Sequence, residues 1–255
     1  MTRPLFFGPA DQVRSAEPGA AFVLGGDEGR HAATVRRLVA GERIDVSDGA
    51  GYRLGGVIAA VGTGTVELRV ETAGQDPAPR HRLVLVQALA KGGRDEQAVE
   101  AATELGVDGV VPWHAERSIV RWRGDKAEKG RQKWVSLVGA AAKQSRRSFV
   151  PEVHGVLDTS GLAGWASSVD RMLVLHEDAE DSLADRMSAL RGAGALDAPS
   201  STAVVVGPEG GISDAELGKL RAAGAHTARL GPHVLRSSSA GPAALVLLNH
   251  LLGRW

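Results

Sequence analysis

The chain of 255 residues carries 30 basic and 30 acidic side chains, and this zero formal net charge excludes a protein that binds polyanions over its whole surface. The absence of cysteine excludes disulfides, thiolate catalysis and cysteine-based zinc sites. A chain of this length has room for one large or two small domains with a sizeable core.

No segment has the length and hydrophobicity expected of a targeting or membrane-spanning sequence. The apolar run that follows Met1 is too short for a signal peptide. The longest apolar run, residues 243–252, contains Asn249 and His250 and is shorter than the roughly 20 residues that cross a bilayer. We therefore expect a soluble cytoplasmic protein without a membrane partner.

Residues 1–75 are expected to form a β-rich domain with one helix. Asp27 is a candidate N-cap for a helix that carries Ala32 and Val35 and ends before Gly41. Short strands with alternating apolar residues are expected at 43–47, 52–61 and 65–71. This pattern favours a small barrel.

Basic side chains are frequent on the expected helix. His31, Arg36 and Arg37 lie within it, and Arg30 and Arg3 are nearby in the sequence. Such residues can contact the phosphates of a nucleic acid. They are equally typical of an ordinary solvated helix face, so the pattern alone leaves both interpretations open.

Residues 76–80 are expected to be a linker, because two prolines and polar neighbours favour an extended connection. The remainder, 81–255, alternates strands with helices, which predicts a parallel sheet covered by helices. Strands are expected at residues 83–90, 107–113, 171–176, 203–206 and 226–230. Helices are expected at residues 94–105, 125–145, 182–190, 214–223 and 242–252.

The segment 117–150 is locally basic, with ten basic residues and only two acidic ones. Trp113, Trp122 and Trp134 are adjacent to it or interleaved with it. Basic residues with aromatic neighbours can follow a nucleic-acid backbone and stack on its bases. The alternative is a solvated helix whose tryptophans face the core.

Residues 203–211 are expected to form a buried strand followed by a glycine-rich loop. Ser213 and Glu216 have capping-box spacing, so a helix should begin directly after the loop. The glycine spacing matches neither phosphate-binding motif, and Glu209 would repel a phosphate. Pro208 also removes a backbone donor. The loop is therefore either a tight turn or a site for a neutral or cationic ligand at the carboxyl end of a strand.

Common catalytic and metal-binding motifs are missing from the sequence. It contains no Gly-x-Ser-x-Gly and no His-Glu-x-x-His, and its eight histidines show no metal-ligand spacing. We therefore expect no metal site.

Several stretches, in order along nearly the whole chain, together resemble the bacterial 16S ribosomal RNA (uracil-1498-N3)-methyltransferase family of the trefoil-knotted SPOUT class. They are residues 31–38 with Gly41 and 48–49, Lys91 with 103–107, Pro112 with 116–118, residues 144–146 with 150–151, residues 207–211, and residues 230–232 with 234–236. Each stretch is weak evidence by itself, whereas the joint match is strong.

The resemblance implies an α/β knotted C-terminal domain with a mostly parallel sheet and a small N-terminal PUA-like β-barrel that helps to bind RNA. It also implies S-adenosylmethionine as cofactor, 16S ribosomal RNA of the small ribosomal subunit as partner, and a homodimer formed through the C-terminal domain. The implied cofactor-binding residues are Leu175, His176, Glu177, Gly207, Pro208, Glu209, Gly210, Gly211, Leu230, Gly231, Val234, Leu235, Ser237 and Ser239.

The same resemblance suggests residues for RNA binding and for catalysis. The RNA-binding candidates are Arg3, His31, Arg36, Arg37, Lys91, Arg117, Arg121 and Arg146. Arg236 is the candidate that stabilises charge on the uracil oxygens, with a structural ion pair as the alternative. Glu209 is a possible general base, but its alternative role is to orient the cofactor or the loop.

The chain departs from the family pattern at two points. The family usually has Thr-Glu-Thr where this chain has Ser237, Ser238 and Ser239, so the hydroxyls remain and a carboxylate is lost. The family also tends to have Glu in place of Lys143. Because proline suits the first helical turn, Pro242 predicts a late start of the last helix. The lost carboxylate motivates a second interpretation, an RNA-binding protein with weak or lost catalysis.

Overall fold

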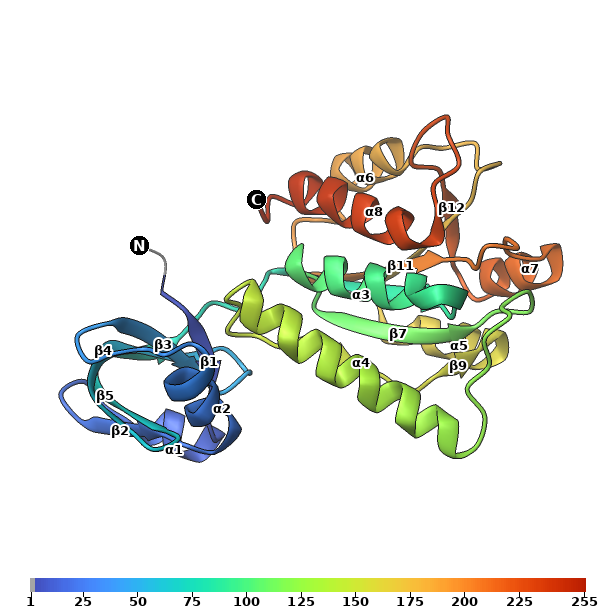
Figure 1. Cartoon of the computed structure of the whole chain (residues 1–255). Coiled ribbons are helices and arrows are strands. Elements are labelled where there is room, and N and C mark those ends of the chain that lie inside the picture. The colour runs from blue at the N-terminus through green and yellow to red at the C-terminus, as the bar shows by residue number, and fades with distance from the viewer. Residues whose placement is uncertain (1–2) are drawn as a thin grey trace. The chain divides into compact units, whose positions relative to one another are not determined.

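The computed structural model describes residues 3–255, which divide into two compact units (Figure 1). The first unit contains residues 3–78 together with Ala142–Val150, and the second contains Pro79–Ala141 and Pro151–Trp255. None of the helices within residues 3–255 combines the length and the hydrophobicity that a membrane span requires.

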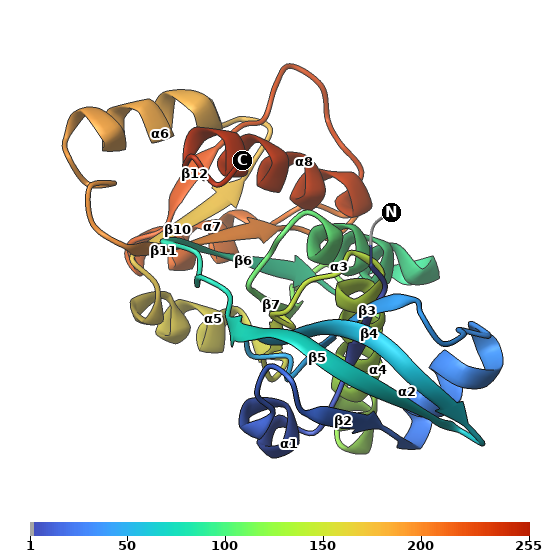
Figure 2. The ribbon, with the colours of Figure 1, turned by 90° about the vertical axis from the view of Figure 1, so that its left-hand side faces the viewer.

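The first unit is built on a curled five-stranded sheet with the order β1-β3-β4-β5-β2 (Figure 2). Its strands are β1 (Leu5–Phe7), β2 (Ala21–Leu24), β3 (Arg43–Ser47), β4 (Tyr52–Gly62) and β5 (Thr65–Gln75). The pair β1/β3 is parallel and the other pairs are antiparallel. The long β4/β5 hairpin turns at Gly64, whose φ of 72° suits a residue without a Cβ. Alternating apolar residues, including Phe6, Ile44 and Leu54, fill the core.

The helical part of the first unit differs from the sequence prediction. It consists of α1 (Ala10–Ser15), α2 (Gly26–Arg30) and a turn of π-helix, η1 (His31–Val35). The prediction that Asp27 is the N-cap is wrong, because the helix begins at Gly26 and Gly25 is the N-cap. The helical structure also ends at Val35, several residues before Gly41. Arg37, two residues after this end, adopts a positive φ of 52°.

The segment Ala142–Val150 belongs to the first unit because its backbone bonds to the loop that follows β3. The carbonyl of Ser148 accepts hydrogen bonds from the Gly51 N–H at 3.0 Å and from the Ser47 hydroxyl at 2.9 Å. The Val150 N–H donates to the Gly49 carbonyl at 2.8 Å. The sequence prediction placed this segment in the second domain. Its hydrogen-bond partners lie about a hundred positions away in the chain, so no local pattern indicates them.

The second unit contains a parallel sheet with the order β12-β10-β11-β6-β7-β8, and β9 also pairs with β7. Its strands are β6 (His81–Ala88), β7 (Gly109–His114), β8 (Glu152–Val153), β9 (Leu157–Asp158), β10 (Arg171–Leu175), β11 (Ser200–Val206) and β12 (His226–Ala228). Its helical segments are η2 (Lys91–Gly93), α3 (Arg94–Glu104), α4 (Asp125–Gln144), α5 (Thr159–Trp165), η3 (Ala166–Ser168), α6 (Leu183–Gly192), α7 (Asp214–Ala222) and α8 (Ser237–Leu251).

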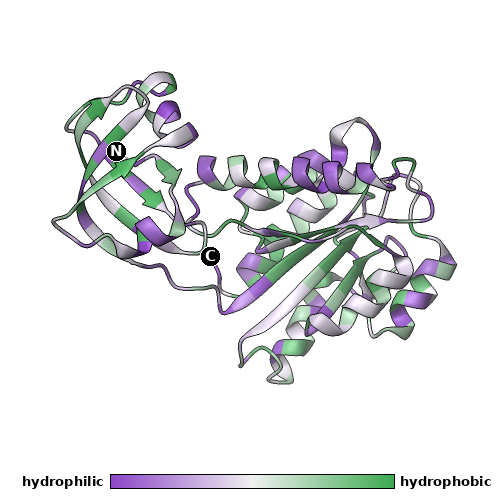
Figure 3. Cartoon of the chain, turned by 90° about the horizontal axis from the view of Figure 1, so that it is seen from below, coloured by the Kyte–Doolittle hydropathy of each residue, from purple (hydrophilic) through white to green (hydrophobic). Residues whose placement is uncertain are grey.

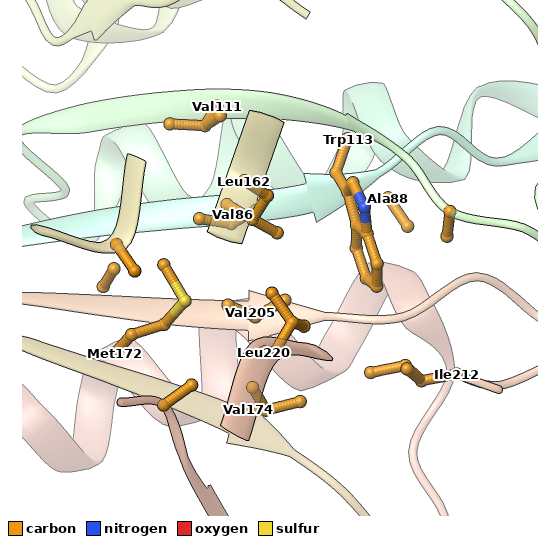
Figure 4. Packing of buried hydrophobic residues seen from close by; sticks show 14 of the residues in the cluster. Val86, Ala88, Val111, Trp113, Leu162, Met172, Val174, Val205, Ile212 and Leu220 are labelled. Carbon is orange, nitrogen blue, oxygen red and sulfur yellow. The ribbon is translucent and has the colours of Figure 1, made fainter. Parts of the chain in front are cut away.

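Helices cover both faces of this sheet, whose strands are mainly hydrophobic (Figure 3). Side chains alternate between the faces of a strand. On one face, Val86 and Val205 pack with Leu162 of α5 and Leu220 of α7 (Figure 4). On the other face, Leu85 lies against α8, where a Cβ on Gly241 would approach its Cδ1 to 2.8 Å.

Two predictions for the second unit are wrong. Helix α8 begins at Ser237, so Pro242 lies inside the helix and not in its first turn. The proline costs the helix one backbone hydrogen bond, and burial of the apolar face with Leu245 and Leu248 offsets this cost. The interpretation of the tryptophans as base-stacking residues is also wrong for Trp113 and Trp134, since both are fully buried.

Candidate functional site

A cavity of about 660 Å³ lies in the second unit where β10, β11 and β12 end. The carboxyl ends of neighbouring parallel strands meet at one sheet edge, so the loops that follow them converge there. Three loops line the cavity: residues 175–178 after β10, residues 207–212 after β11, and residues 229–236 after β12. Ser237 and Ala240 of α8 complete this wall.

The structure brings almost all of the predicted cofactor-binding residues together. The ones that line the cavity are Leu175, His176, Glu177, Gly207, Pro208, Glu209, Gly210, Gly211, Leu230, Gly231, Val234, Leu235 and Ser237. Ser239 is not among the lining residues, and its N–H donates to the Arg236 carbonyl in the first turn of α8. Arg117, predicted as an RNA contact, and Arg236 lie in the same lining.

The sequence reasoning missed several polar and charged residues of the cavity. Arg94, Asp178 and Asp214 line it, as do Arg229 and His233. A signal for Arg94 was present, because it follows β6 and the Gly92-Gly93 turn, and β6 ends at the same sheet edge. Its partner was not evident from the sequence.

Arg94 pairs with the acidic residue of the glycine-rich loop. Its Nη1 lies 2.8 Å from Oε1 of Glu209. Burial alone raises the pKa of Glu209, but a backbone hydrogen bond and the positive charges of Arg94 and Lys91 outweigh it and lower this pKa overall. Glu209 therefore carries a negative charge at neutral pH and is a weak proton acceptor.

The glycine-rich loop folds back on itself and is held from outside by Arg117. The Gly211 N–H donates to the Pro208 carbonyl at 2.9 Å, and Gly211 has a φ of 74° that favours glycine. The Arg117 Nη1 donates to the Gly210 carbonyl at 3.0 Å. A Cβ on Gly210 would lie 3.0 Å from the Arg117 Cβ, so a glycine permits this close approach.

The first turn of α8 presents two groups without partners to this region. Within the described residues 3–255, the exposed guanidinium of Arg236 has no hydrogen-bond or ion-pair partner, so its alternative role in a structural ion pair is not observed. The hydroxyl of Ser237 is buried and also lacks a partner. Both groups can therefore interact with a ligand.

The RNA-binding candidates outside the cavity are spread over both units. In the first unit, Arg3 lies 3.6 Å from Asp45, and the His31 ring contacts Phe6. Arg36, Arg37 and Arg146 are exposed there. In the second unit, Lys91 is exposed on η2, and Arg121 donates to the Glu116 carbonyl at 2.6 Å.

The lining contains acidic and basic side chains and suits a small organic ligand that carries both cationic and anionic groups. Its volume lies within the range typical of such sites, about 300–1,000 Å³. The carboxylates of Glu177, Asp178, Glu209 and Asp214 line it beside backbone groups of three loops. Within residues 3–255, no group of three or more histidine, aspartate or glutamate side chains is arranged to hold a metal ion.

Two family models match the chain. A model described as an RNA methyltransferase domain matches residues 76–249, and a model described as an RNA methyltransferase PUA domain matches residues 24–71. The first match contains every loop of the cavity.

The chain is also similar to proteins of known name over almost its full length. It is 41% identical over 243 residues to the ribosomal RNA small subunit methyltransferase E of Mycobacterium bovis, with 94% of this chain and 90% of that protein covered. The protein of the same name from Bacillus subtilis is 30% identical over 236 residues, with 92% and 91% covered. A crystal structure of ribosomal RNA small subunit methyltransferase E from Neisseria gonorrhoeae bound to S-adenosyl methionine has a TM-score of 0.82 at 25% identity and covers 98% of both chains.

Proposed function

The chain belongs to the ribosomal RNA small subunit methyltransferase E family, and we propose that it transfers a methyl group from S-adenosylmethionine to N3 of uridine 1498 of 16S ribosomal RNA. Its second unit has the mostly parallel α/β fold of the knotted SPOUT class, and its first unit has a PUA-like fold. The three-loop cavity is the observation that carries the proposal.

The residues that line the cavity fit S-adenosylmethionine, which has a sulfonium and an amino group and no phosphate. The charged Glu209 carboxylate suits the two cationic groups, and the loop lacks the spacing of a phosphate site. Backbone groups of the loops 175–178, 207–212 and 229–236 are proposed to hold the remainder of the molecule. A solved family member bound to the same cofactor supports this assignment.

Bound S-adenosylmethionine supplies a methyl group that its sulfonium already activates. The uracil N3 proton must pass to a base or to solvent before N3 bonds to the methyl carbon, and its loss places negative charge on the ring, spread onto O2 and O4. This charge disappears as N3 takes the methyl group, while the electron pair of the broken carbon–sulfur bond stays on sulfur and neutralises the sulfonium. The unpaired guanidinium of Arg236 at the cavity is proposed to stabilise this charge, and the cavity walls to align N3 with the methyl carbon.

Glu209 is proposed to bind and orient the cofactor. A general base must accept a proton readily at the working pH. The lowered pKa of Glu209 and its ion pair with Arg94 disfavour that role. They favour a permanently charged carboxylate beside a cationic ligand.

We further propose that the first unit and the edge of the cavity bind the RNA, and that two chains associate through their second units. The exposed Arg36, Arg37 and Arg146 support the first proposal, because arginines bind phosphates well. Exposed apolar side chains support the second: Val234 is 76% exposed and Val246 of α8 is 41% exposed.

The test uses small ribosomal subunits that lack this modification. They are incubated with the protein and methyl-labelled S-adenosylmethionine, and the label is mapped by mass spectrometry of RNA fragments. We expect label on N3 of a single uridine, and a heat-treated protein provides the control. Cofactor binding without any label would instead favour an RNA-binding protein with lost catalysis, with Ser238 as the first position to restore to glutamate.

A further inference from the structure

A buried carboxylate connects the glycine-rich loop to a distant loop of the sheet. Glu216 of α7 is only 5% exposed, and it belongs to the capping box in which the Ser213 hydroxyl accepts from its backbone N–H. A capping box by itself needs only these two residues. Glu216 makes two further contacts that helix capping does not require.

The further contacts both reach Oε1 of Glu216 from outside α7. The backbone N–H of Glu116 donates to it at 2.8 Å, and the Thr159 hydroxyl of α5 donates at 2.6 Å. The Ser213 hydroxyl also donates to Oε2 of Glu116 at 2.5 Å. The segment after β7 is thereby fixed to the start of α7.

Arg117, the residue next to Glu116, connects this fixed segment to the wall of the cavity. It donates to the Gly210 carbonyl, and a Cβ added to Gly210 would lie 3.0 Å from the Arg117 Cβ. A flexible arginine loses conformational entropy when it is held in one position. Because the hydrogen bonds of Glu116 already fix the neighbouring backbone, less conformational entropy is lost when the Arg117 side chain binds Gly210.

We infer that Glu216 is a positioning residue, which acts through Glu116 and Arg117 to hold the 207–211 wall of the cavity in its ligand-ready geometry. This inference rests on the proposed function, since it assigns S-adenosylmethionine to that cavity. Arg117 uses one of its five N–H donors on Gly210, so other donors remain for RNA.

The test compares Glu216→Ala with Glu216→Gln and Arg117→Ala in the full-length chain. Glutamine keeps an oxygen that accepts from Glu116 and Thr159 and loses only the acceptor of the Ser213 N–H, which lies 3.2 Å from Oε2, so Glu216→Gln should keep the Kd for S-adenosylmethionine within about twofold. Glu216→Ala and Arg117→Ala should each raise this Kd about tenfold, in line with a lost hydrogen bond to a preorganised wall. The double variant should bind no more weakly than Arg117→Ala alone. Additive losses would overturn the inference.

Lys219→Ala is the matched control. Lys219 also joins α7 to α5, through the Ser160 hydroxyl at 2.7 Å, but it does not touch the segment at Glu116. This variant should leave the Kd unchanged. An equal loss in Lys219→Ala would mean that general loosening of α7 explains the effect.

Hydrogen exchange measured without any ligand provides a second readout. Exchange of residues 207–211 should accelerate in Glu216→Ala and in Arg117→Ala. If Glu216→Ala speeds exchange only within α7, Glu216 acts only as part of the helix cap and the inference fails. Unchanged exchange of residues 207–211 in Arg117→Ala would also overturn the inference, even if Glu216→Ala does not fold. A wild-type protein that fails to bind S-adenosylmethionine would defeat the proposed function, whereas the exchange experiment still decides the coupling.

Discussion

The electrostatics of single residues decide what the cavity can bind. Glu209 lies in a partly buried position that by itself favours the neutral acid, and Arg94 and Lys91 keep it charged. Because its folded pKa is below the ordinary value of 4.5, the interactions of the charged form persist above that value and are lost only as the pH falls through the lowered pKa.

Arg94→Ala is therefore predicted to raise the pKa of Glu209, since burial then acts with less opposition. The carboxyl carbon signal of Glu209 in an NMR titration measures this directly. S-adenosylmethionine binding should also be lost at a higher pH in the variant than in the wild type. Glu209→Gln serves as the reference without a titrating group, and an identical Glu209 midpoint with and without Arg94 would contradict the prediction.

Arg236 is predicted to act on the reaction more than on cofactor binding. Arg236→Ala should lower kcat by about a hundredfold, as expected when a charge-stabilising donor is removed. The Kd for S-adenosylmethionine should change less than twofold. Arg221→Ala, at an arginine outside the cavity lining, is the control. Equal losses in kcat and in cofactor affinity would refute the assigned role.

At the scale of elements, the loop between β7 and α4 is anchored by a neutral histidine. The backbone N–H of Trp122 donates to Nε2 of His114 at 2.7 Å, so this nitrogen must be unprotonated. Burial lowers the pKa of His114, and the charges of Arg121 and Arg123 lower it further, against an opposing contribution from Asp158. The loop carries Arg117 as well, so its order affects the cavity.

This anchoring predicts a pH dependence of stability. The folded state favours the neutral ring, so the contribution of His114 is complete above the unfolded pKa of about 6.5 and declines as the pH falls below it. His114→Gln keeps an acceptor that does not titrate. The difference in Tm between wild type and this variant should therefore shift in favour of the variant between pH 7 and pH 5. A constant difference would show that His114 does not titrate with unfolding.

At the scale of the whole molecule, neither unit is a single continuous segment of the chain. The strand-rich first unit includes Ala142–Val150, a segment that lies between two parts of the second unit in the sequence. A cut at the linker therefore removes the partners of Ser148 and Val150. All the loops of the cavity belong to the second unit.

A protein truncated to residues 80–255 is predicted to bind S-adenosylmethionine with the affinity of the full chain and to form the proposed dimer. It should have a lower Tm than the full chain, because residues 142–150 lose their backbone partners. It should also bind ribosomal RNA poorly, as measured by filter binding. Unchanged RNA affinity would remove the first unit from the proposed RNA-binding surface.

The sequence by itself determined the features that depend on near neighbours. The alternation of strands and helices after residue 80, the glycine-rich loop and the capping box of Ser213 and Glu216 follow from local periodicity and backbone chemistry, and the structure confirms them. The joint motif match also identified the family. The loop and the capping box are each contained within a few adjacent residues, whereas the alternation and the family match add up many such local signals in chain order.

Only the tertiary structure decided which distant residues meet. Arg94 and Glu209 are separated by 115 positions, and Glu116 and Glu216 by 100. The start of α8 was decided in the same way, since burial of its apolar face outweighs the local preference of Pro242. Packing of the whole sheet fixes these contacts, and no local pattern encodes the separation in space of segments so far apart in the chain.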